Sequence, residues 1–108
     1  MNEIAYANLR SSTEAAFTAL YEIDAKKLDT KERDQLQEVM GAAYLAMIRL
    51  ENTEFANLTG IAVRQLAALK TGAEELQKQL EGLKTTTEII KTISSSLNLL
   101  RSIATILK

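Results

Sequence analysis

The segment TTTEIIKTISSSLNLLRSIATILK, residues 85–108, decides the fold of this chain. Only four of its residues are charged, and isoleucine, leucine and alanine occupy most sides of any helix built from it. A helix that is apolar around most of its circumference must be covered by other elements or by a partner. The segment is therefore expected to be either the central helix of a bundle or a surface that meets another molecule.

Apolar residues in this segment recur in alternating steps of three and four, the spacing of a coiled-coil seam. Further apolar residues flank the seam, so the apolar arc is wider than one neighbouring helix can cover. We expect part of this arc to remain exposed in a single bundle and to serve as the interaction surface. The candidate interaction residues are Ile89, Ile93, Leu99, Ile103 and Ile106.

The remaining composition predicts an all-α protein with one domain, residues 1–108. The chain has no proline and only four glycines, so little interrupts helix formation. A length of 108 residues suffices for one modest core. The formal net charge of −1, with neither sign collected into a block, argues against nucleic acid as a partner.

Helical periodicity and cap signals divide the chain into four predicted helices. Asp29 and Glu32 have the spacing of a capping box, as do Thr85 and Glu88. Gly82 stands where a left-handed cap is expected to end the third helix. The predicted helices are residues 3–27, 30–57, 60–82 and 85–107.

Residues 52–60 carry signals for both a turn and a helix, because turn-forming asparagine, threonine and glycine alternate there with apolar residues in helical register. We place a break near residues 57–60. The alternative is one helix from about residue 30 to 82, roughly 80 Å long, which a monomer of this size does not cover. That alternative is a long-helix, coiled-coil-like oligomer.

The third predicted helix carries a strict heptad seam, and its outer face offers Glu74 and Lys78 as a favourable pair four residues apart. Helices of similar length joined by short turns favour an up-down-up-down four-helix bundle. The seam consists of Ala62, Leu66, Leu69, Ala73, Leu76, Leu80 and Leu83.

Chemistry-bearing motifs are few, because histidine and cysteine are both absent. Glu51 and Glu54 lie three apart, as oxygen ligands of a hard metal ion do, but the Glu-x-x-His pattern of ferritin-like sites is missing. Residues 70–72, Lys-Thr-Gly, resemble a short element of penicillin-recognising serine enzymes, without the other two motifs of that family. We predict no catalytic, cofactor-binding or metal-binding residue.

The predicted function is a non-enzymatic protein-interaction module that self-associates or binds a partner protein, as an adaptor, chaperone, immunity-type or structural component. The alternative is a membrane-active protein whose amphipathic C-terminal helix lies at a membrane surface. The first residues lack the basic and apolar regions of a signal peptide, and no apolar run approaches ~18 residues. A cytoplasmic location is expected, and secretion by a signal-independent route stays open.

Overall fold

All of the regular structure in this chain is helical. The computed structural model describes residues 1–108 and contains five α-helices and no strand, so the all-α prediction is confirmed. Two short 3₁₀ turns, labelled η, lie between the first three helices. The elements in chain order are α1 (Glu3–Tyr21), η1 (Ala25–Lys27), α2 (Thr30–Asn52), η2 (Phe55–Asn57), α3 (Gly60–Leu80), α4 (Thr86–Ser95) and α5 (Leu97–Ile106).

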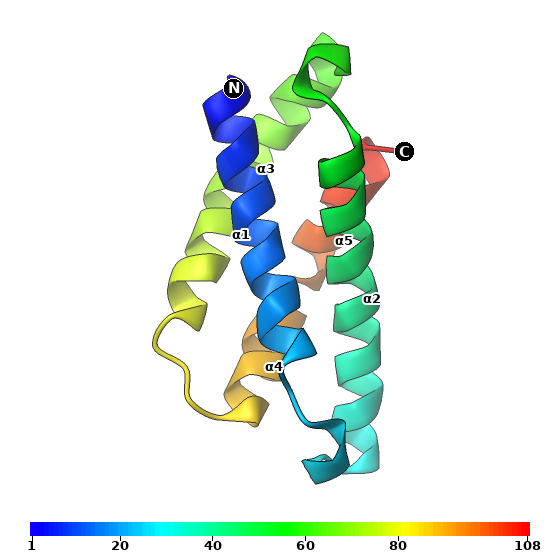
Figure 1. Ribbon diagram of the computed structural model, residues 1–108, viewed down its shortest axis with the longest axis vertical. Coiled ribbons are helices and arrows are strands. Elements are labelled where there is room, and N and C mark those ends of the chain that lie inside the picture. Colours follow the sequence, from blue (N-terminus) through cyan, green and yellow to red (C-terminus); the bar gives the residue numbers. More distant parts are fainter.

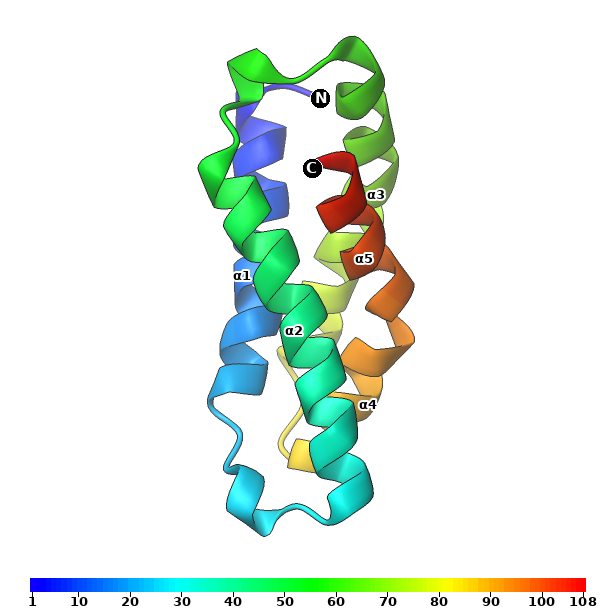
Figure 2. The same cartoon turned by 90° about the vertical axis from the view of Figure 1, so that its right-hand side faces the viewer.

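The helices stand in four columns, the fourth of which is α4 followed by α5 (Figures 1 and 2). Chain direction alternates, since α1 and α3 run one way and the other helices run the opposite way. Helix α1 packs against α2 and α3, whereas α2 packs against α1, α4 and α5. The consecutive helices α2 and α3 therefore occupy diagonal corners, and residues 53–59 cross one end of a molecule that measures 43 × 25 × 18 Å.

The crossover between α2 and α3 confirms the predicted break within residues 52–60. Helix α2 ends at Asn52, and the Thr59 hydroxyl begins α3 by accepting a hydrogen bond from the Ala62 amide at 3.0 Å. The alternative of one helix across this region is wrong. The second helix is shorter than expected, because η2 turns the chain back toward α1 before residue 57.

The buried side chain of Tyr6 holds this crossover against α1. Its hydroxyl lies 2.9 Å from the Leu50 carbonyl oxygen and 2.8 Å from the Thr53 carbonyl oxygen, and its ring centroid lies 5.8 Å from that of Phe55. Carbonyl groups at a helix end have no partner within the helix, so this hydroxyl supplies one. Burial raises the pKa of Tyr6, and the charge of Arg10 lowers it by less.

The first helix is also shorter than its predicted range of 3–27. Helix α1 ends at Tyr21, and the Asp24 carboxylate then accepts a hydrogen bond from the Lys26 amide at 3.0 Å, which starts η1. An aspartate that bonds to nearby backbone in this way competes with continuation of the helix. The apolar periodicity of the sequence continues past Tyr21 because Leu28, which lies beyond the end of α1, is also buried.

Both predicted N-terminal caps are present, although only one is reciprocal. The Asp29 carboxylate accepts from the Glu32 amide at 2.8 Å, and the Glu32 carboxylate accepts from the Asp29 amide at 3.4 Å. The Thr85 hydroxyl accepts from the Glu88 amide at 3.3 Å without a bond in return. Gly82 is not left-handed, since no residue has a positive φ, and the loop of residues 81–85 reverses the chain without one.

The last predicted helix is divided at Ser96. The Ser96 backbone has φ −104° and ψ 13°, and its amide donates to the Ile93 carbonyl oxygen at 2.9 Å. The Ser95 hydroxyl donates to the Thr92 carbonyl oxygen at 2.6 Å, whereas the buried Ser94 hydroxyl has no partner. A serine hydroxyl that bonds to the preceding turn bends a helix, so the Ser95 hydroxyl contributes to the division.

One apolar core of 19 buried residues joins the helices. The predicted seam of α3 faces this core, where Leu66, Ala73 and Leu76 are buried. Gly72 gives α5 room to approach, because a Cβ atom at this position would lie 3.4 Å from the side chain of Leu99. The core thus uses the apolar surface of α4 and α5.

Candidate interaction surface

The five predicted interaction residues do not form an exposed surface. Only part of this set was expected to stay exposed, and Ile93 and Ile103 are the members that have no solvent exposure and belong to the core. Ile89, Leu99 and Ile106 are half-buried and pack against the core. The reason is that α4 and α5 contact both α2 and α3, and two neighbours cover an arc too wide for one.

The large apolar side chains that remain exposed lie on the other three helices. Ile4 and Ile61 are near the N-termini of α1 and α3, and Tyr21 is the last residue of α1. Tyr44 and Leu45 are adjacent in the middle of α2 and are 50% and 42% exposed. Isolated exposed apolar residues are ordinary on protein surfaces, whereas groups of them mark contact sites.

Helix α2 is apolar on two opposite sides. Its inner side contributes Leu36, Val39, Ala43, Ala46 and Leu50 to the core. Residues 40–48 contain no charge, and their solvent side forms a second stripe with the helical spacing of three, four and seven residues. The stripe, called the outer stripe below, consists of Gly41, Tyr44, Leu45 and Ile48. A surface helix is normally polar on the side away from the core, so folding does not account for the outer stripe.

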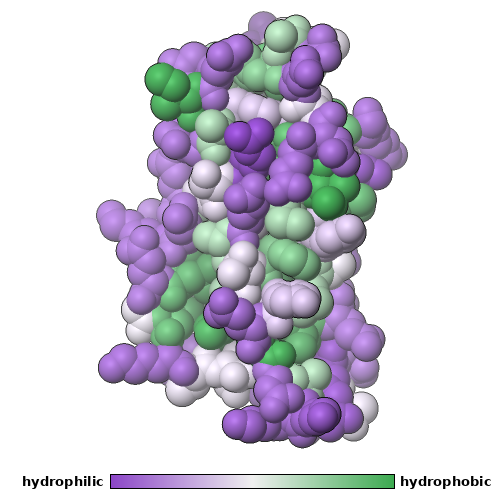
Figure 3. Space-filling view, viewed as in Figure 1, coloured by the Kyte–Doolittle hydropathy of each residue, from purple (hydrophilic) through white to green (hydrophobic).

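An aromatic cluster extends the outer stripe onto α1. The ring centroid of Phe17 lies 5.5 Å from that of Tyr44 on α2 and 5.9 Å from that of Tyr21 on α1, with tilted ring planes. Tyr21 is 71% exposed, and Phe17 is half-buried. Figure 3 shows apolar and near-neutral atoms among polar ones over the face formed by α1 and α2. Aromatic residues of this kind are enriched at protein interfaces.

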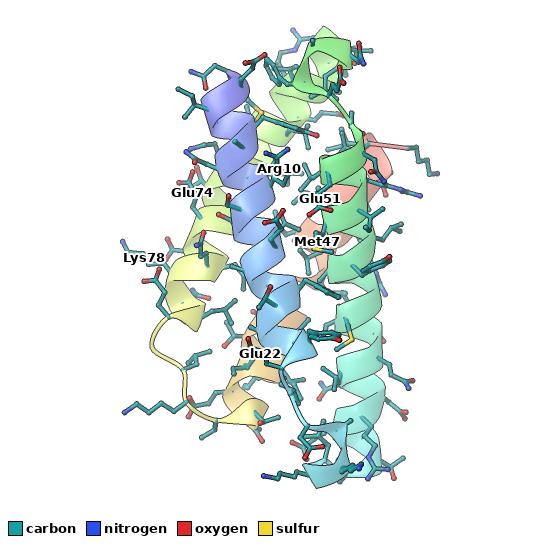
Figure 4. All side chains as sticks on the ribbon, in the orientation of Figure 1. Arg10, Glu22, Met47, Glu51, Glu74 and Lys78 are labelled. Carbon is teal, nitrogen blue, oxygen red and sulfur yellow. The ribbon has the colours of Figure 1, made fainter.

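A pair of carboxyl groups lies farther along the contact between α1 and α2. A hydrogen bond with Glu51 is the main reason that the pKa of Glu14 is raised, burial and the charge of Glu51 raise it further, and Arg10 opposes them. Figure 4 shows Arg10, Met47 and Glu51 in the space between the two helices. Glu14 therefore holds a proton more readily than an isolated glutamate does.

Glu51 and Glu54, which lie three apart in the sequence, do not share a helix face. Helix α2 ends at Asn52, which moves Glu54 into the crossover. The two carboxylates line a cleft of about 420 Å³ that also contains Glu3 and Arg10. No group of three or more acidic side chains lies close enough together to hold a metal ion.

A groove of about 310 Å³ runs beside the outer stripe, between α2 and α5. Arg49, Arg101 and Lys108 line it together with Leu45, and no acidic side chain does. The Arg49 guanidinium donates to a backbone carbonyl of α5. Arg101 lies 3.3 Å from the carboxylate of Glu38, and both side chains are largely exposed. This basic groove places positive charge next to the apolar surface.

The Lys-Thr-Gly sequence at residues 70–72 lies inside α3. Lys70 forms an ion pair with Glu74, which therefore pairs one turn back and not with the expected Lys78. The ammonium group of Lys70 is thus held beside a carboxylate on the surface of a helix.

The sequence signal for the outer stripe is the uncharged run of residues 40–48. Tyr44 and Ile48 look like flanking core residues in the sequence, because periodicity does not separate two stripes on one helix. The chain matches no protein-family model, no curated protein and no solved structure. None of its helices combines the length and apolar character needed to cross a membrane.

Proposed function

We propose that this protein is a non-enzymatic protein-interaction module whose contact surface is the outer stripe of α2, extended by the aromatic cluster. The observation that carries the proposal is the exposure of Tyr44 and Leu45 on a helix whose inner side already supplies the core. Its partners are protein, either another chain or a second copy, and no cofactor is involved. The scaffold acts as a four-helix bundle in which α4 and α5 together serve as the fourth helix.

The alternative of a membrane-active C-terminal helix has less support. Ile93 and Ile103 would have to leave the core before they could contact lipid. The exposed apolar residues of α2 need no such rearrangement, so a protein contact there costs less free energy.

A photo-crosslinking amino acid placed at position 45 tests the proposal in cells that express the chain. The matched control is the same amino acid at Gln79, an exposed position on α3, the helix diagonal to α2. We expect protein-sized crosslinked products from position 45 and few from position 79. Equal yields at both positions, or none at position 45, would contradict the proposal.

A further inference from the structure

We propose that the partner on the outer stripe is a second copy of this chain, bound so that the two α2 helices run antiparallel about a two-fold axis near residue 43. The inference rests on the proposed function and names the occupant of its surface. Its basis is that the charges around the outer stripe are complementary to themselves when one copy is reversed.

The two ends of the outer face of α2 carry opposite charges. Asp34 and Glu38 precede the uncharged run, and Glu38 already pairs with Arg101 of its own chain at 3.3 Å. Arg49 follows the run and lines the basic groove with Lys108, whereas Glu51, which also follows it, is hydrogen-bonded to Glu14 of α1. An antiparallel partner centred near residue 43 brings its own Glu38 opposite Arg49, and the same contact repeats on the other side of the axis. Such a two-fold contact closes on itself and adds no further copies.

The parallel arrangement of two α2 helices is unfavourable for the same reason. It would set each Glu38 beside the partner's Glu38 and each Arg49 beside the partner's Arg49, and like charges across an interface weaken binding. It would also set the two helix dipoles parallel, which is unfavourable, whereas the antiparallel arrangement sets them in opposite directions.

Basic residues in the acidic half of α2 do not cancel this pattern. Lys31 would face residue 55, beyond the end of the partner's α2, which stops at Asn52. The Arg33 guanidinium donates to the Ala25 carbonyl oxygen at 3.0 Å, so it is directed toward the turn after α1.

Gly41 provides the space that a close helix contact requires. A Cβ atom at this position would meet nothing within 4 Å, so the backbone of α2 is open to solvent there. In the antiparallel register the partner's Leu45 lies opposite Gly41. A leucine side chain that enters the gap left by a glycine is the ridge-into-groove contact by which helices pack.

Analytical ultracentrifugation of the purified full chain tests the inference. We expect a species of about twice the 11.9 kDa chain mass. Leu45→Lys should weaken the dimer at least tenfold, because it places charge in the apolar contact beside the basic groove, whereas Gln79→Lys should leave the dimer unchanged. A chain that remains monomeric at every concentration of a 100-fold dilution series up to ~1 mM overturns the inference. A dimer with a Kd above that concentration would be weaker than specific dimers are.

Charge reversal tests the register, with the free energy of unfolding of each variant measured in parallel, because Glu38 pairs with Arg101 and Arg49 donates to a backbone carbonyl of α5 within the same chain. Glu38→Arg should weaken the dimer about tenfold, because each of the two symmetric contacts becomes repulsive, at roughly 0.5–1 kcal/mol per exposed pair. Adding Arg49→Glu to this variant should restore the dimer. A dimer that resists Leu45→Lys, or a double variant that fails to recover, overturns the antiparallel α2 contact.

The photo-crosslinking result separates failure of this inference from failure of the proposed function. Crosslinks from position 45 to other proteins, with a monomeric purified chain, overturn the second copy and leave the interaction surface in place. The absence of crosslinks and of a dimer overturns both.

Discussion

The Tyr6 hydroxyl is a single group on which the diagonal crossover depends. It lies within hydrogen-bond distance of the buried carbonyl oxygen of Leu50 and of the part-buried carbonyl oxygen of Thr53. A buried acceptor left without a donor costs free energy that a solvent-exposed acceptor does not. The hydroxyl therefore fixes where α2 ends and the crossover starts.

Tyr6→Phe should lower the free energy of unfolding by about 1–3 kcal/mol, because the ring remains while the buried Leu50 carbonyl oxygen and the part-buried Thr53 carbonyl oxygen lose the one O–H that they share. Tyr21→Phe is the matched control, since its ring is exposed, and a change within about 0.5 kcal/mol is expected. Urea denaturation measures both. Equal effects of the two substitutions would mean that the Tyr6 hydroxyl does not hold the crossover.

The raised pKa of Glu14 makes a second residue-scale prediction, on pH dependence. An acid whose pKa is raised in the folded state stabilises the fold below its unfolded pKa of ~4.3, and this contribution is lost as pH rises through the folded pKa. Glu14→Gln keeps a hydrogen-bond donor at every pH. The variant should therefore gain stability relative to the natural chain between pH 4 and pH 7.

The expected gain is small, below about 0.5 kcal/mol, because the Glu14 and Glu51 carboxyls are near the surface. Thermal unfolding at several pH values measures it, with Glu22→Gln, at the residue that follows α1, as control. A relative loss of stability toward pH 7 would have the wrong sign for a shared proton.

Among the elements, helix starts were more predictable than helix ends. The starts of α2 and α4 follow from Asp29 and Thr85, because a capping side chain acts within four residues of sequence. The ends depend on contacts that sequence does not display, such as Tyr6 meeting the crossover. Apolar periodicity also continues past real ends, as at Leu28.

The sequence does not show which part of the wide apolar arc on α4 and α5 stays exposed. The width of the apolar arc on α4 and α5 indicates how much apolar surface must be covered. It does not indicate how many neighbouring helices cover it. Two helices cover Ile93 and Ile103, so the surplus apolar surface lies instead on α2. The signal there was weaker, because Tyr44 and Ile48 lie beside a normal core stripe.

Replacement of glycines in two helices tests the packing of these elements. Gly41→Ala should stabilise the monomer by about 1 kcal/mol, because alanine favours helix and a Cβ atom meets nothing there. Gly72→Ala should gain less, since its Cβ atom contacts Leu99. Urea denaturation in the Leu45→Lys background keeps dimerisation out of the comparison. A larger gain at Gly72 would contradict the described contact.

At the scale of the whole molecule, the diagonal crossover places α2 between α1 and the column of α4 and α5. All four columns contribute to one core, so the fold uses the inner side of every helix. The outer stripe is left over from this arrangement, with acidic residues before it and a basic groove beside its other end. That combination is the basis for an antiparallel contact between two copies.

Thiol crosslinking tests this contact most directly, because the natural chain has no cysteine and an introduced one is the only thiol. Leu45→Cys, treated with a short bismaleimide at micromolar protein, is predicted to give abundant covalent dimer. The yield should fall when Glu38→Arg is added, and Gln79→Cys should give little dimer. Equal crosslinking from positions 45 and 79, or none from position 45, would contradict an α2 contact between two copies.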